Sequence, residues 1–227
     1  MSKGDDVIEL ISALLMAGST PVTNAAAPEL VALRVRTYAH KQVDGAAVRA
    51  ALEVADALLG SAGVVVAWRL CDSAQSCPVE DTPVREIVLI LSSRARQNGR
   101  ENCGVAAHGG RGSAGTVMVS IPCVADVAFR LSRRSRTGTN PLLAMPRHDD
   151  LVGAVVAHEI AHLLGIGHAT AGLMRATLEV EDILALRTGK LRFSPAEAGD
   201  MRIAARLAGE ARLRSAAAGS PPNPLRQ

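Results

Sequence analysis

Three histidines and a glutamate lie together in the segment HEIAHLLGIGH, residues 158–168. His158 and His162 are four residues apart, so on a helix their imidazoles stand one above the other on the same face. Glu159 is one position further round, where its carboxylate reaches a water on a bound metal without binding the metal itself. Gly165 suits a helix end in a left-handed turn, which folds the chain back and presents His168 as a third nitrogen donor. The spacing therefore predicts one Zn²⁺ held by three imidazoles, with a fourth position open to water.

Such a centre is suited to hydrolysis of an amide bond. Zinc lowers the pKa of its bound water to about 7 and polarises a carbonyl group. We expect Glu159 to act as the general base that takes the proton of the zinc-activated water and passes it to the leaving amine. Buried imidazoles that converge without a metal would leave nitrogens unsatisfied, which is costly.

The pattern HExxHxxGxxH followed by a methionine resembles the signature of the metzincin zinc peptidases. Here the segment GLM (Gly172–Met174) follows His168 closely, and the resemblance implies a turn that places Met174 beneath the metal. The sequence from 172 to 202 is also similar to an uncharacterised bacterial family of matrixin-like proteins. The whole resemblance extends loosely from 27 to 207. It implies a zinc metalloendopeptidase, a hydrolase with one catalytic ion that acts on peptides or proteins.

Two alternatives to this interpretation stay open. In the first, the chain is a non-catalytic zinc-stabilised binding module. In the second, it is a gluzincin- or aspzincin-type peptidase whose third metal ligand is a downstream carboxylate. Glu179, Glu181 and Asp182 are the candidates for that carboxylate, although the start of a helix also explains them. A glutamate beside the metal favours an enzyme, because a purely structural site has no use for a base.

The surrounding pattern predicts one α+β domain with a twisted, mixed sheet of about four to five strands, as in metzincins. The long zinc-binding helix and further C-terminal helices complete it. By analogy with metzincins, the strand at 115–122 would be the sheet edge that pairs with an extended peptide substrate. We expect strands at 29–39, 64–71, 86–93 and 115–122, helices at 43–63, 149–165, 179–186 and 194–211, and a long loop at 94–115.

Composition narrows the class of protein further. Of the 227 residues, 48% are hydrophobic and 21% charged, which is typical of a globular domain and argues against global disorder. Aromatic residues make up only 2% and the net charge is +3, so a nucleic-acid partner is not expected. No uncharged apolar run is long enough to span a bilayer. The sequence leaves the oligomeric state open.

The cysteines and the N-terminus bear on the compartment. Cys71, Cys77, Cys103 and Cys123 allow three disulfide pairings, with Cys71–Cys77 and Cys103–Cys123 as plausible local pairs, or four free thiols. In the matrixin-like family, a segment like VVVAWRLC ends in a cysteine that pairs a few residues later. An even count favours disulfides and a secreted, periplasmic or cell-envelope protein over a cytoplasmic one.

The chain divides by prediction into three parts. Residues 1–27 form a signal peptide or a mobile N-terminal segment. An apolar stretch followed by small residues favours a signal peptide, whereas Asp5, Asp6 and Glu9, which lie just before and within that stretch, argue against it. Residues 28–214 form a single metzincin-like catalytic domain. Residues 215–227 form a disordered tail rich in proline and alanine.

Overall fold

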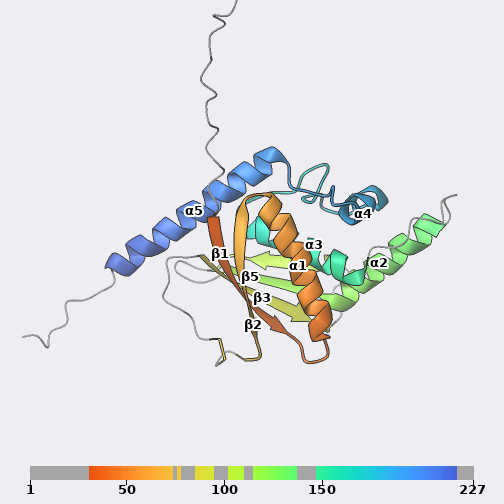
Figure 1. Ribbon diagram of the computed structural model, residues 1–227, viewed down its shortest axis with the longest axis horizontal. Helices are drawn as coiled ribbons and strands as arrows, with labels where there is room; N and C mark the ends of the chain where they lie inside the picture. Colours follow the sequence, from red (N-terminus) through yellow and green to blue (C-terminus); the bar gives the residue numbers. More distant parts are fainter. Residues whose placement is uncertain are drawn as a thin grey trace, which may run out of the picture.

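A five-stranded sheet with helices packed against it forms the body of the computed structural model (Figure 1). The structure describes residues 31–73, 76–77, 85–94, 102–109, 115–136 and 147–218. The strands lie in the order β2-β1-β3-β5-β4. Their bounds are β1 Val31–Ala39, β2 Val64–Cys71, β3 Arg85–Ser92, β4 Gly104–Ala107 and β5 Gly115–Ser120. The predicted α+β class with a mixed sheet is confirmed.

Strand direction is uniform except at one edge. β1 pairs in parallel with β2 and β3, and β3 pairs in parallel with β5. β4 runs antiparallel to β5, with Gly104 opposite Val119. The parallel β1–β2 pair requires a crossover, which α1 (Gly45–Ser61) supplies. Asp44 caps this helix, since its carboxylate accepts a hydrogen bond from the Ala46 amide at 3.1 Å.

The core lies between the sheet and two helices, α1 and α3 (His148–Leu163), which pack against each other. The sheet contributes side chains that are fully buried, among them Leu33, Val35, Ile87, Leu89, Val117 and Val119. The burial of these apolar side chains holds α3 in a fixed place against the sheet. Two further helices, α2 (Ile121–Arg136) and α4 (Val180–Arg187), also contact α3. The last helix, α5 (Pro195–Ala218), contacts β1, β2 and β3.

Two sequence-based predictions are wrong between residues 94 and 136. The segment 94–115 was expected to be a loop throughout, yet β4 lies within it. The strand at 115–122 ends at Ser120, and Pro122 lies in the first turn of α2 rather than ending a strand. Proline fits there because the first amides of a helix have no partner within the helix.

The predicted substrate-pairing edge also needs correction. β5 lies between β3 and β4, so it is an interior strand with both sides occupied. β4 is the strand at that edge of the sheet. Strand order is a tertiary property that the pattern along one strand does not contain.

The predicted division of the chain is only partly described. The N-terminal segment 1–27 lies outside the described residues, as do residues 219–227 of the predicted tail. α5 ends at Ala218, beyond residue 215 where the tail was expected to begin. None of the helices in the described part of the chain has the length and hydropathy that crossing a membrane requires.

Candidate metal centre and its pocket

Helix α3 carries His158, Glu159 and His162 through the middle of the protein. Its first turn is stabilised by Asp149 and Asp150, acidic residues that suit a helix N-terminus. The Asp150 carboxylate also accepts a hydrogen bond from the Arg147 amide at 3.0 Å. Most of the helix is buried on all sides, as expected for a core element. The three candidate side chains therefore stand on a rigid support.

The predicted turn after α3 is present. Gly165 has φ +86°, the left-handed region that other residues resist. The Ile166 amide donates to the Ala161 carbonyl at 3.1 Å, which closes the helix end. A Cβ added at Gly165 would meet nothing within 4 Å, so the backbone conformation, rather than lack of space, calls for glycine. The turn sends the chain back towards α3 and brings His168 to the other two histidines.

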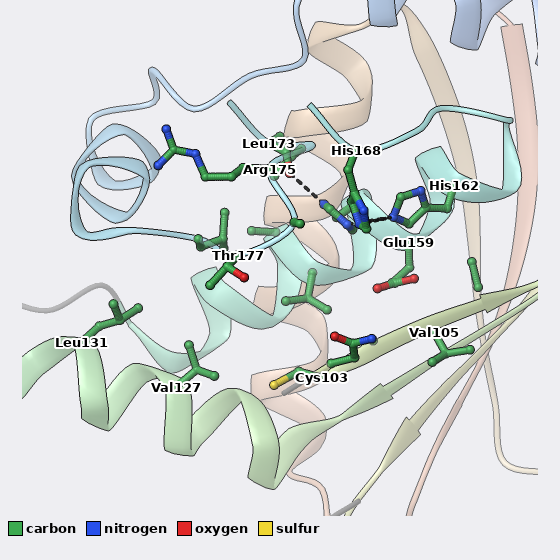
Figure 2. A pocket seen from close by; sticks show the side chains of 18 of the residues that line it. Cys103, Val105, Val127, Leu131, Glu159, His162, His168, Leu173, Arg175 and Thr177 are labelled. Carbon is green, nitrogen blue, oxygen red and sulfur yellow. Dashed lines mark hydrogen bonds between the residues drawn. The ribbon is translucent and has the colours of Figure 1, made fainter. Parts of the chain in front are cut away.

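The three imidazoles converge. The Nε2 atom of His162 lies 2.9 Å from Nε2 of His158 and 3.1 Å from Nε2 of His168. One nitrogen from each ring lies within 4.8 Å of the others, and among the described residues this is the group suited to hold a metal ion. Figure 2 shows His162 and His168 meeting at this point, with Glu159 below them.

Hydrogen bonds at the far side of two rings fix which nitrogen faces the centre. Nδ1 of His158 donates to the Leu173 carbonyl at 2.8 Å, and Nδ1 of His162 donates to the Ile166 carbonyl at 2.7 Å. A carbonyl only accepts, so each Nδ1 carries the hydrogen and each Nε2 of the neutral ring is left with a lone pair. Lone pairs that face each other at this distance repel unless a cation lies between them. The donor set therefore fits a metal, with carbonyls orienting its ligands.

Burial keeps at least one of these rings neutral. Burial lowers the pKa of His158 to about 4, an effect opposed by its bond to the Leu173 carbonyl and reinforced by His162 and His168. His158 is therefore unprotonated at neutral pH, which is the form that binds a metal.

The segment after His168 forms a tight turn next to the histidines, where the Leu173 carbonyl accepts the hydrogen bond from Nδ1 of His158. Gly172 has φ +78°, and the Arg175 amide donates to its carbonyl at 3.2 Å. The Ala169 amide donates to the Met174 carbonyl at 2.8 Å, which links the turn to the residue that directly follows His168. Met174 is fully buried in the core. Its predicted place beneath a metal stays a prediction.

The downstream carboxylates are engaged elsewhere. Arg175 forms ion pairs with Glu179 at 2.8 Å and with Asp182 at 3.3 Å. Glu181 is exposed in the first turn of α4. Within the described ranges, the cluster of potential ligands that includes His158 contains only histidines. The arrangement thus favours His168 over a carboxylate as the third ligand.

A cavity of about 490 Å³ opens beside the histidines. Glu159 lines it and is only 8% exposed, and Figure 2 shows its carboxylate directed from α3 towards β4. One wall is the segment Asn102–Ala106, which includes the start of β4, and another is the face of α2 with Val127 and Leu131. The segment Arg175–Leu178 completes the lining. The cavity therefore offers room for a ligand between the glutamate and apolar walls.

The sequence-based predictions included neither β4 nor α2, the two elements that form walls of this cavity. The signal that could have found them is the pairing of Cys103 with Cys123, which was one of the plausible pairs. Both expected disulfides are present, Cys71–Cys77 and Cys103–Cys123, and no free cysteine remains. The second disulfide joins the residue before β4 to the first turn of α2 and so links the two walls.

Comparisons with known proteins give similarity of fold only. The sequence matches no protein-family profile and no curated protein sequence. The fold is similar to that of archaemetzincin from Methanopyrus kandleri, with a TM-score of 0.44 and 16% identity, over 77% of this chain and 96% of that one. It is also similar to metalloproteinase-II from Bacteroides fragilis, with a TM-score of 0.46 and 15% identity, over 80% of this chain and 55% of that one. Both TM-scores are too low for either similarity to assign the chain to a family or a function.

Proposed function

We propose that this protein is a zinc-dependent metalloendopeptidase of the metzincin type. One observation carries the proposal: the Nε2 atoms of His158, His162 and His168 converge, with two rings held in the metal-binding tautomer by carbonyls. The sequence motif and the open cavity beside Glu159 support it. The narrower assignment of this protein to the matrixin-like group is supported by sequence resemblance alone.

The chain's own groups have distinct roles in this reaction. A Zn²⁺ ion held by the three imidazoles would supply a bound water with a pKa of about 7 and an electrophile for the scissile carbonyl. Glu159 accepts the proton of the attacking water and returns it to the leaving amine. The carboxylate is suited to this exchange because it lines the cavity next to the ligands without belonging to the converging group.

The edge of the sheet is suited to bind the peptide. Among the described residues β4 pairs with β5 and with no other strand, and its first residues line the cavity. An extended peptide can add to such an edge through main-chain hydrogen bonds, which places its backbone beside Glu159. β4, rather than β5, is thus the strand suited to pair with a substrate.

Disulfides point to an oxidising compartment. All four cysteines are paired, and such bonds persist in secreted, periplasmic or cell-envelope proteins rather than in the cytoplasm. We therefore propose export, with peptides or proteins outside the cytoplasm as substrates.

The test is cleavage of unfolded casein combined with zinc analysis. We expect Glu159→Ala to keep one zinc per chain and to lose cleavage, because the metal ligands remain while the base is gone. Glu181→Ala is the matched control, since it removes an exposed glutamate from α4 and should cleave like wild type. Full activity in Glu159→Ala would remove this residue from the mechanism. A wild-type protein that binds zinc but cleaves nothing would support the binding module instead.

A further inference from the structure

Gly104 lies against the side chain of Glu159. It is the first residue of β4 and is buried, and it pairs with Val119 of β5 while α3 packs on the same strand. The glutamate comes from the middle of α3, so the contact joins two elements that are far apart in the sequence. Figure 2 shows the carboxylate directed at this part of the sheet.

The contact leaves no room for a side chain at position 104. A Cβ added to Gly104 would lie 2.5 Å from Cγ and 2.6 Å from Cδ of Glu159, and it would also overlap with Oε1. Real Cβ atoms essentially never approach other heavy atoms within 3.0 Å. Any residue other than glycine must therefore displace either the strand or the carboxylate.

The strand is the less movable of the two. The residue before Gly104 is Cys103, which is covalently linked to Cys123 in the first turn of α2. The Cys103 carbonyl also accepts a hydrogen bond from the Ser120 amide at 2.8 Å. The backbone at position 104 is thus held by a disulfide and by pairing with β5. The glutamate side chain, by contrast, has rotatable bonds and borders an open cavity.

We propose that Gly104 is a positioning residue for Glu159: the missing side chain on β4 defines where the carboxylate rests relative to the three histidines. This inference rests on the proposed function for its catalytic consequence, but the contact itself does not. Gly104 touches neither the metal nor the reacting atoms and acts through the glutamate. A shift of the carboxylate of about 1 Å is enough to cost on the order of 100-fold in rate.

A double-mutant cycle on the full chain tests the contact without any assay of activity. We expect Gly104→Ala to lower the midpoint of thermal unfolding by about 2–4 °C, the low end for overpacking in a domain of this size, because the overlapping atoms belong to a side chain that can rotate aside. In a Glu159→Ala background the same substitution should cost much less, because the overlapping atoms are gone. Gly60→Ala is the control, since a Cβ there meets nothing within 4 Å and its shift should be equal in both backgrounds. Equal costs of Gly104→Ala in the two backgrounds would overturn the proposal.

Kinetics then test the positioning role. For Gly104→Ala we expect kcat to fall about 100-fold, with KM nearly unchanged and one zinc per chain retained. A merely structural defect would instead lower the fraction of active protein or the zinc content. An unchanged kcat, or a loss of zinc that accounts for the lost activity, would refute the role. If wild type cleaves no peptide, the proposed function fails, while the unfolding cycle still decides whether Gly104 and Glu159 are coupled.

Discussion

The two disulfides should differ in what their removal does, although both are covalent links of the same kind. Cys103–Cys123 joins β4 to α2, which are two walls of the cavity beside the histidines. Cys71–Cys77 joins the end of β2 to the chain just beyond it, and neither cysteine lines that cavity. Replacing each pair by serines therefore compares a link at the site with a link away from it.

The size of each effect on stability follows from the loop that the disulfide closes. The sequence separations are 20 residues for Cys103–Cys123 and 6 for Cys71–Cys77. Loop-closure entropy gives about 3 kcal/mol for the longer loop and about 2 kcal/mol for the shorter one. The two double variants should thus differ by only about 1 kcal/mol in their free energy of unfolding.

Activity should separate them far more strongly. Without Cys103–Cys123, β4 keeps its four-residue pairing with β5 and its packing against α3 but loses its covalent link to α2, so the strand beside Glu159 loosens. We expect that variant to lose most of its casein cleavage at temperatures where it is still folded. The Cys71–Cys77 variant should cleave at close to the wild-type rate under the same conditions. Denaturant unfolding and initial cleavage rates measure both quantities. Equal losses of cleavage in the two variants would refute the reasoning.

Three further predictions concern α3 and the turn that follows it. Gly153→Ala should lower the free energy of unfolding by about 1–3 kcal/mol, because its Cβ would lie 2.7 Å from Cβ of Val54 on α1. This cost outweighs the better helix propensity of alanine. A more stable variant would contradict this packing. Gly165→Ala should cost about 1–2 kcal/mol because φ is +86°, whereas Gly167→Ala, which meets no neighbouring atom, should cost clearly less in the same denaturant titration. Because burial lowers the pKa of His158 to about 4, the unfolded chain binds the proton first, so the metal-free protein should lose stability as the pH falls from 6.5 towards 4. Thermal unfolding of a His158→Gln variant should show a shallower loss over that range, and an unchanged slope would contradict this assignment.

The sequence predicted the elements whose pattern is local. The segments with helical patterns gave α1, α3, α4 and α5, although α5 runs to Ala218 rather than to 211. The site followed from the same helix, since the spacing of His158 and His162 defines their common face. The turn at Gly165 followed from the backbone preference of glycine.

The missed elements depend on tertiary contacts. β4 has four residues in a stretch rich in glycine and arginine, so pairing with β5 and the Cys103–Cys123 link stabilise it rather than its own pattern. α2 begins with Ile121 directly after β5, and Pro122 in its first turn looked like the end of a strand. The order of the strands, and with it the position of β4 at the edge beside the site, depends on contacts between segments. The pattern of a single segment does not contain it.

Location of the metal tests the central claim most directly. A crystal of the zinc-loaded protein, with diffraction recorded on both sides of the zinc absorption edge, shows each zinc ion as an anomalous peak. We predict one peak per chain, within about 2.1 Å of Nε2 of His158, His162 and His168, with the remaining coordination position facing the cavity that Glu159 lines. A peak bound elsewhere, or no zinc between these three rings, would contradict the account.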